Sequence, residues 1–252
     1  QVTSGCKLSC GFSRSPLWLG NSLGIKKKAG NLFMIVTIDG PAGAGKSTVA
    51  RMVADQLGFM FLDTGAMYRC VALLAHENKI AWENEDAIGE LGRTLAYFAD
   101  HDKVFIAGED VTQTIRSPEV TATVHRAADN VQVRESLVKL QRQLASGNNV
   151  VTEGRDQGTL AFPDAECKIY LSASPTERAQ RRVDQLNANG GDVTLAEILE
   201  QQTIRDEQDE ARELGGLQAA DDALFVVTDG MNVMEVVEHI ERLVRIREND
   251  SV

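Results

Sequence analysis

Short apolar runs alternate along the chain with longer segments in which apolar residues recur every three or four positions. The short runs are rich in β-branched residues and are bounded by turn-forming residues, as is typical of buried strands. The predicted strands cover residues 35–38, 59–62, 149–153, 167–171 and 224–227. The longer segments have the period of amphipathic helices. The predicted helices cover 48–57, a segment ending at 75, 85–98, a segment starting at 117, 131–144, 174–187, 194–214 and a segment starting at 232.

Helix-capping residues support several of these boundaries. Asn84, Ser117 and Asn232 each stand directly before a helical pattern, where a side-chain oxygen can accept an unpaired backbone N–H. Pro118 follows Ser117 and suits the first helical position. Thr194 and Glu197 have the spacing of a capping box. Residues 103–110 read as a small hairpin with a Gly-Glu-Asp turn.

Strands that alternate with helices predict an α/β fold, a parallel sheet covered by helices on both faces. We see no internal repeat in the sequence. Residues 1–33 differ from the rest, since they are rich in Ser and Gly and contain five basic residues and no acidic one. We expect them to form a disordered N-terminal extension of a domain covering 34–252. The apolar run at 17–19 is too short for a signal peptide, and a transit peptide stays open.

The charge balance limits the classes of function. The 252 residues carry a formal net charge of −11, and residues 34–252 carry 37 acidic against 21 basic side chains. This excess of acidic side chains argues against a broad nucleic-acid-binding surface. Any anion must therefore bind at a local cluster of Arg and Lys. No apolar run is long enough to span a membrane. The four cysteines form no metal-binding pattern, and Cys70 and Cys167 read as reduced core residues of a cytoplasmic protein.

A glycine-rich motif stands between the first predicted strand and helix. It fits G-x-x-x-x-G-K-[ST], and with the Thr that follows it comprises Gly40, Pro41, Ala42, Gly43, Ala44, Gly45, Lys46, Ser47 and Thr48. In this strand–loop–helix context the backbone N–H groups can surround phosphate oxygens, the Lys reaches the β- and γ-phosphates, and the Ser hydroxyl can bind Mg²⁺. Asp39 can hold a Mg²⁺-bound water or brace the loop. The sequence therefore predicts a nucleoside triphosphate site rather than an ordinary glycine turn.

The remaining sequence narrows the class of phosphate-loop protein. It contains neither an Asn-Lys-x-Asp tetrapeptide that reads guanine nor a transporter-type Leu-Ser-Gly-Gly-Gln segment. Arginine-bearing segments are instead spread along the chain, as a second phosphorylated substrate would require. Besides the loop, these are Leu-Asp-Thr-Gly-Ala-Met-Tyr-Arg at 62–69, Gly-Glu-Asp-Val at 108–111 with Ile-Arg at 115–116, Glu-Gly-Arg-Asp-Gln-Gly-Thr at 153–159, and Arg-Asp-Glu-Gln-Asp-Glu-Ala-Arg at 205–212.

In this order the segments resemble those of bacterial cytidylate kinases, over essentially all of 34–252. The resemblance implies a phosphate-loop sheet with a monophosphate-binding insert, roughly 81–133, and a helical lid, roughly 184–200. It implies transfer of the γ-phosphate of ATP to CMP or dCMP with Mg²⁺, by a cytoplasmic monomer that binds neither nucleic acid nor membrane. A kinase with another acceptor, such as UMP, stays open, and so does an ATPase or nucleotide switch.

The resemblance also implies roles for individual residues. Lys46, Arg155, Arg178 and Arg182 would act on the transferring phosphoryl group, and Ser47 and Asp39 would hold the metal. The acceptor would be bound by Thr64, Arg69, Arg134, Arg155, Asp156, Arg205, Asp209 and Arg212. Plainer interpretations stay open: Arg69 and Arg134 as surface charges, Thr64 as a helix cap, Arg155 with Asp156 as a structural ion pair, and 205–212 as an exposed ion-pair ladder. Since Arg178 and Arg182 lie four residues apart, they would repel unless an anion lay between them.

The sequence departs from the family pattern at two positions. His125 stands where the family usually has a small hydroxyl residue, in the helix after Ser117, which leaves base contacts there undecided. The usual Pro-Leu after the last arginine is Gly216-Leu217.

Overall fold

The protein is described here by a computed structural model covering residues 33–188 and 190–250, so the predicted extension up to residue 32 lies outside the described residues. Five strands form an entirely parallel sheet in the order β2-β6-β1-β7-β8. Their bounds are β1 Ile35–Asp39, β2 Met60–Asp63, β6 Val150–Gly154, β7 Cys167–Ser172 and β8 Leu224–Val227. The predicted α/β class and all five predicted strands are confirmed.

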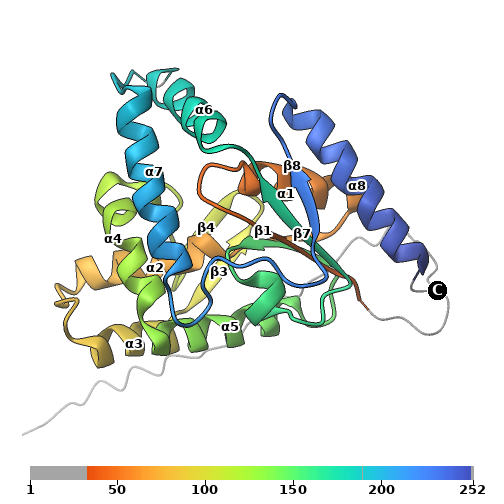
Figure 1. Cartoon of the computed structure of the whole chain (residues 1–252). Helices are drawn as coiled ribbons and strands as arrows, with labels where there is room; N and C mark the ends of the chain where they lie inside the picture. The colour runs from red at the N-terminus through yellow and green to blue at the C-terminus, as the bar shows by residue number, and fades with distance from the viewer. Residues whose placement is uncertain (1–32, 189, 251–252) are drawn as a thin grey trace, which may run out of the picture. The chain divides into compact units, whose positions relative to one another are not determined.

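Helices cover both faces of this sheet, as predicted (Figure 1). On one face α1 (Lys46–Leu57) and α8 (Val233–Asp250) pack against alternate residues of β1, Val36 and Ile38. On the other face α2 (Thr64–Glu77) and α5 (Val131–Ala145) pack against β2 and β6. Because the strands are buried on both sides, their apolar runs are nearly continuous. Cys70 and Cys167 are buried and free, as predicted.

The segment between α2 and α5 lies within the predicted insert, and its apolar residues join the same core as those of α2 and α5. It comprises α3 (Glu85–Thr94), β3 (Tyr97–Asp100), β4 (Lys103–Ile106), β5 (Glu109–Asp110), the 3₁₀ turn η1 (Thr114–Arg116) and α4 (Pro118–Asp129). The three strands pair antiparallel. The prediction of a helix through Phe98 was wrong. Apolar residues keep helical spacing past the end of α3, but Tyr97 and Phe98 belong to β3, where they pair with Ile106 and Phe105.

Two packed helices follow β7 and enclose the predicted lid. α6 (Pro175–Ala188) and α7 (Leu195–Glu210) share a small apolar cluster that includes Ala179, Val183 and Ile198. The capping box at Thr194 is confirmed, and so are the caps at Asn84, Ser117 and Asn232. The predicted extension of α7 to Leu214 was wrong. The helix ends at Glu210, and the returning chain donates Leu217 N–H to the Asp209 carbonyl.

Residues 157–161, which were not predicted as regular structure, form the π-helical turn η2 directly after β6. Within residues 33–188 and 190–250 there is no helix with both the length and the apolar character of a membrane span.

Candidate active site

The phosphate loop joins the carboxyl end of β1 to the first turn of α1. Gly43 and Gly45 have φ of 77° and 86°, in the left-handed region that a Cβ disfavours. Gly45 precedes the first residue of α1, so the loop amides lie at a helix N-terminus, where backbone N–H groups and the helix dipole favour an anion. The predicted strand–loop–helix context is confirmed.

Lys46 and Ser47 are positioned by the loop and by β6. Lys46 is 6% exposed, and its Nζ donates to the Pro41 carbonyl at 2.8 Å. Burial, followed by the charge of Arg155, holds the pKa of Lys46 below its usual value. Ser47 Oγ donates to Glu153 Oε1 at 3.0 Å, and burial raises the pKa of Glu153. An added phosphate charge would therefore stabilise the protonated lysine.

Glu153 lies next to the loop because β6 runs parallel to β1 with Glu153 opposite Ile38. Mg²⁺ is bound in nucleotide sites by few protein ligands together with phosphates and water. The Ser47 hydroxyl and the buried Glu153 carboxylate fit that pattern. Over the described part of the chain no three His, Cys, Asp or Glu side chains cluster as an all-protein metal site would need.

Asp39 has a different set of contacts. Its Oδ1 accepts the N–H of Gln157 at 2.9 Å, and its Oδ2 accepts the N–H of Gly158 at 2.7 Å. Burial raises the pKa of Asp39 to about 7, against the lowering effect of these two bonds. With both oxygens Asp39 thus holds the start of η2 rather than the phosphate loop that it was predicted to brace. Its role at Mg²⁺ stays a prediction.

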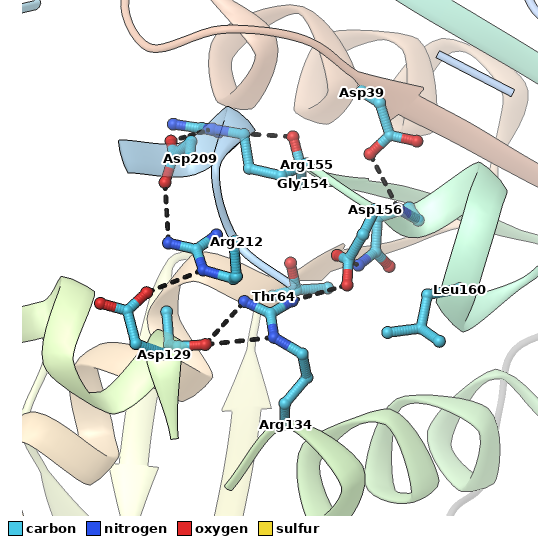
Figure 2. Close-up of polar contacts among 12 residues, drawn as sticks. Asp39, Thr64, Asp129, Arg134, Gly154, Arg155, Asp156, Leu160, Asp209 and Arg212 are labelled. Atoms are coloured by element: carbon cyan, nitrogen blue, oxygen red, sulfur yellow. Dashed lines mark hydrogen bonds and ion pairs between the residues drawn. The ribbon is translucent and has the colours of Figure 1, made fainter. Parts of the chain in front are cut away.

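A polar cavity lies beside the loop, where β6 ends. Side chains from α2, α4, α5 and α7 line it together with residues at and just after the end of β6 (Figure 2). The residues that line it are Thr64, Gly65, Tyr68, Arg69, Val124, His125, Ala128, Arg134, Glu153, Gly154, Arg155, Asp156, Arg205, Asp209 and Arg212. All eight residues predicted to bind the acceptor are among them.

Arg134 and Asp156 form a buried ion pair in this cavity. Arg134 Nη1 lies 2.6 Å from Asp156 Oδ2, and the two side chains are 3% and 4% exposed. The remaining guanidinium contacts are with the Ala128 carbonyl, at 3.1 Å and 2.8 Å, and with the ring of Tyr68, whose centroid is 5.3 Å away. The interpretation of Arg134 as a surface charge was wrong. A removed partner would leave a buried charge uncompensated.

Asp209 connects a second network, which runs from β6 to α4. Its oxygens pair with Arg155 Nε at 2.7 Å and Arg212 Nη2 at 2.9 Å, and Arg212 Nε pairs with Asp129 at 2.8 Å (Figure 2). Burial acts to raise the pKa of Asp209, but the charges of Arg155 and Arg212 hold this pKa below its usual value. Asp209 is 7% exposed, so 205–212 is no exposed ladder. Nor do Arg155 and Asp156 form a structural pair, since each pairs elsewhere.

Thr64 and two arginines complete the cavity. Thr64 Oγ1 donates to the Glu153 carbonyl at 2.6 Å, while Asp63 rather than Thr64 caps α2. Arg69 Nη1 donates to the Ile115 carbonyl and to Thr121, which leaves its other nitrogens for a ligand. Arg205 is exposed and makes no hydrogen bond or ion pair to the residues that the structure describes.

The two arginines of α6 differ in their surroundings. Arg178 is buried and donates to the Ala42 carbonyl of the loop at 2.7 Å. Arg182 is exposed and donates to Gln185, and its charge is among those that act with burial to lower the pKa of Arg69. Asp206 supplies a carboxylate to Arg178, and an anion shared by Arg178 and Arg182 stays a prediction.

Five residues at the site were not predicted to function there: Tyr68, His125, Asp129, Glu153 and Asp206. Tyr68, Glu153 and Asp206 lie inside the quoted motifs, so their positions were visible, but their partners come from distant segments. His125, the departure from the family pattern, does line the cavity.

Comparisons with known proteins agree with this geometry. The family model described as cytidylate kinase matches residues 36–246. A cytidylate kinase of Rhodopirellula baltica is 49% identical over 84% of this chain and 93% of that protein. Those of Geobacter sulfurreducens and Caldanaerobacter subterraneus are each 43% identical, over 87% and 85% of this chain and 96% of each relative. The chain belongs to the cytidylate kinase family.

Proposed function

We propose that the protein transfers the γ-phosphate of ATP to CMP or dCMP and releases ADP and CDP or dCDP. The observation that carries the proposal is the arginine-lined cavity directly beside the phosphate loop. Glu153 is common to both, because it lines the cavity and accepts a hydrogen bond from the loop's Ser47 hydroxyl at 3.0 Å. Two anions bound in these places would lie side by side, as a direct transfer requires.

The phosphate loop is the donor side of this transfer. The N–H groups of Gly43 to Thr48 and the ammonium of Lys46 bind the ATP phosphates, and Ser47 with Glu153 would hold Mg²⁺. When bound, Mg²⁺ would supply positive charge that offsets the negative charge developing on the phosphates. Burial of Lys46 and Glu153 strengthens these interactions because it excludes water.

The cavity is the acceptor side. Arg69 and Arg205 have guanidinium N–H groups without a partner among the described residues, and we assign them to the acceptor phosphate. Asp209, which two guanidiniums keep ionised, suits the ribose hydroxyls. Thr64, Arg134 and Asp156 lie where the base would be read, with Arg212 and Asp129 supporting that wall.

The base contacts explain a preference for cytosine. Cytosine presents an amino group where uracil presents a carbonyl oxygen. An ionised Asp156 only accepts hydrogen bonds, so it can pair with the cytosine amino group and would repel the uracil oxygen. Arg134 supplies the counter-charge to Asp156 in its buried position.

No general base is needed, because the acceptor phosphate is already an anion. Catalysis then consists of positioning and charge neutralisation by Lys46, Arg155, Arg178 and Arg182, with water excluded by closure of α6 and α7. On this account the helices around 184–200 act as the lid and residues 81–133 as the monophosphate-binding insert.

The test is a coupled assay of ADP release with CMP, dCMP, UMP, AMP and dTMP as acceptors. We expect the highest kcat/KM for CMP or dCMP and little ADP release without an acceptor. A higher kcat/KM for UMP would assign the site to another kinase specificity. Substantial ATP turnover with no monophosphate present would instead favour an ATPase or switch.

A further inference from the structure

A closed set of hydrogen bonds joins both lid helices to the phosphate loop. Asp206 Oδ1 on α7 accepts the N–H of Ala42 at 3.1 Å, and Asp206 Oδ2 accepts from Arg178 Nη1 on α6 at 2.6 Å. Arg178 Nη1 also donates to the Ala42 carbonyl at 2.7 Å. One loop residue is thus bound through both its amide and its carbonyl by two side chains from the two helices.

Asp206 compensates a charge that burial makes costly. The Arg178 side chain is 7% exposed and that of Asp206 is 13% exposed. A guanidinium so far from water needs a counter-charge and partners for its N–H groups. A carboxylate without such a partner would lose hydration on burial against the loop and would be more stable exposed to water.

The hydrogen bonds of Arg178 also fix its orientation. A guanidinium has five N–H groups. Arg178 Nη1 uses two of them on Ala42 and Asp206, and Nε uses one on the Ala173 carbonyl at 3.2 Å. The two N–H groups of Nη2 have no partner in the described chain and stay available for phosphate oxygens. Asp206 therefore holds Arg178 without consuming the part that a phosphate would bind.

A neighbouring residue places α7 directly on the loop. Gln202, one turn before Asp206, donates to the Arg178 carbonyl at 3.3 Å. A Cβ added to Gly43 would lie 2.7 Å from Gln202 Nε2, so the Gln202 side chain of α7 lies directly against the loop backbone. The Asp206 contact is therefore part of a close, specific packing of the lid on the donor side.

We propose that Asp206 is the positioning residue of Arg178: its carboxylate joins α6, α7 and the phosphate loop and orients the guanidinium toward the ATP phosphates. This inference rests on the proposed role of Arg178 in phosphoryl transfer. Asp206 itself touches no reacting atom. Its effect reaches ATP through Arg178 and Ala42.

The test compares Asp206→Ala, Asp206→Asn and Asp206→Glu with the unchanged enzyme in steady-state kinetics. We expect Asp206→Ala to lower kcat/KM for ATP by about tenfold or more and to leave KM for CMP within about twofold. Asp206→Asn keeps an acceptor for the Ala42 N–H, so its kcat/KM for ATP should lie between those of Asp206→Ala and the unchanged enzyme. Asp206→Glu should recover part of the loss. Glu207→Ala, which removes an exposed carboxylate of the same helix, should leave both constants unchanged.

A double-mutant cycle separates this role from simple destabilisation. In an Arg178→Ala background, Asp206→Ala should change kcat/KM for ATP by less than about twofold, because Asp206 acts through Arg178 and the first substitution has already removed that guanidinium. Losses that multiply, or an equal rise in KM for CMP, would overturn the proposal. If Arg178→Ala alone left activity unchanged, the proposed role of Arg178 would fail; a loss with Arg178→Ala but none with Asp206→Ala would refute only this inference. Thermal unfolding of each variant shows whether enough folded protein is present at the assay temperature.

Discussion

The donor and acceptor sides of the site are built in opposite ways. The phosphate loop is one continuous segment whose binding groups are mainly backbone N–H groups, held by glycines and a helix N-terminus. The acceptor cavity is assembled from side chains of five elements, and its buried guanidiniums are held by carboxylates such as Asp156 and Asp209. A change in the loop should therefore act locally, whereas a change in the cavity should disturb partners far along the chain.

The largest effect is expected on the donor side. Lys46→Ala removes the ammonium that is proposed to face the ATP phosphates, and we expect kcat to fall by on the order of 10³ with the fold retained. Steady-state kinetics and circular dichroism measure the two outcomes. Lys139→Ala, at an exposed lysine of α5, serves as the control. Near-normal turnover by Lys46→Ala would contradict the assignment of the loop.

On the acceptor side, stability should change as well as activity. Arg134→Ala leaves Asp156 buried without its partner, and we expect the free energy of unfolding to fall by about 3 kcal/mol or more. Urea denaturation measures it. The matched control is Arg126→Ala, which breaks an exposed pair with Glu83 and should cost less than about 1 kcal/mol. Equal losses would mean that the buried pair does not hold the cavity.

A smaller effect should separate the two substrates. Asp209→Ala removes the proposed ribose acceptor and the carboxylate between Arg155 and Arg212. We expect KM for CMP to rise about tenfold while KM for ATP stays within about twofold. Each constant is measured with the other substrate saturating. An equal rise in both would show that Asp209 supports the whole site rather than the acceptor.

The smallest effect concerns protons. The pKa of Lys46 is below its usual value in the free protein, and bound phosphates should raise it. Between these two pKa values ATP binding takes up a proton, so its affinity should fall as pH rises, by at most about tenfold per pH unit. Calorimetry at pH 8 to 9 in buffers of different ionisation enthalpy measures the uptake. Lys46→Arg, which stays charged, should abolish it; unchanged uptake would assign the proton elsewhere.

The same contrast explains what the sequence could predict. The loop was predicted in full because its residues, its glycines and its flanking strand and helix are all local. The cavity residues were predicted from motifs and the family resemblance, and the structure brings all eight together. Their partners were not predicted: Arg155 pairs with Asp209, 54 residues away, and Ser47 with Glu153, 106 residues away. Local sequence patterns do not show which residues so far apart in the chain come into contact.

Two errors in helix length have a similar cause. Past Thr94 the helical spacing of apolar residues continues, yet pairing with β4 draws Tyr97 and Phe98 into a strand. Past Glu210 the chain turns so that Arg212 reaches Asp129 and Gly215 lies against the Arg134–Asp156 pair, where a Cβ would overlap both side chains. In both places a tertiary contact overrides the local pattern.

The most direct test of the central claim is a crystal structure of the protein with CMP bound. The account predicts the phosphate of CMP between Arg69 and Arg205, and the cytosine amino group within hydrogen-bond distance of Asp156. A CMP molecule with its phosphate on the N–H groups of Gly43 to Lys46, or with its base away from Asp156, would contradict the division into donor and acceptor sides.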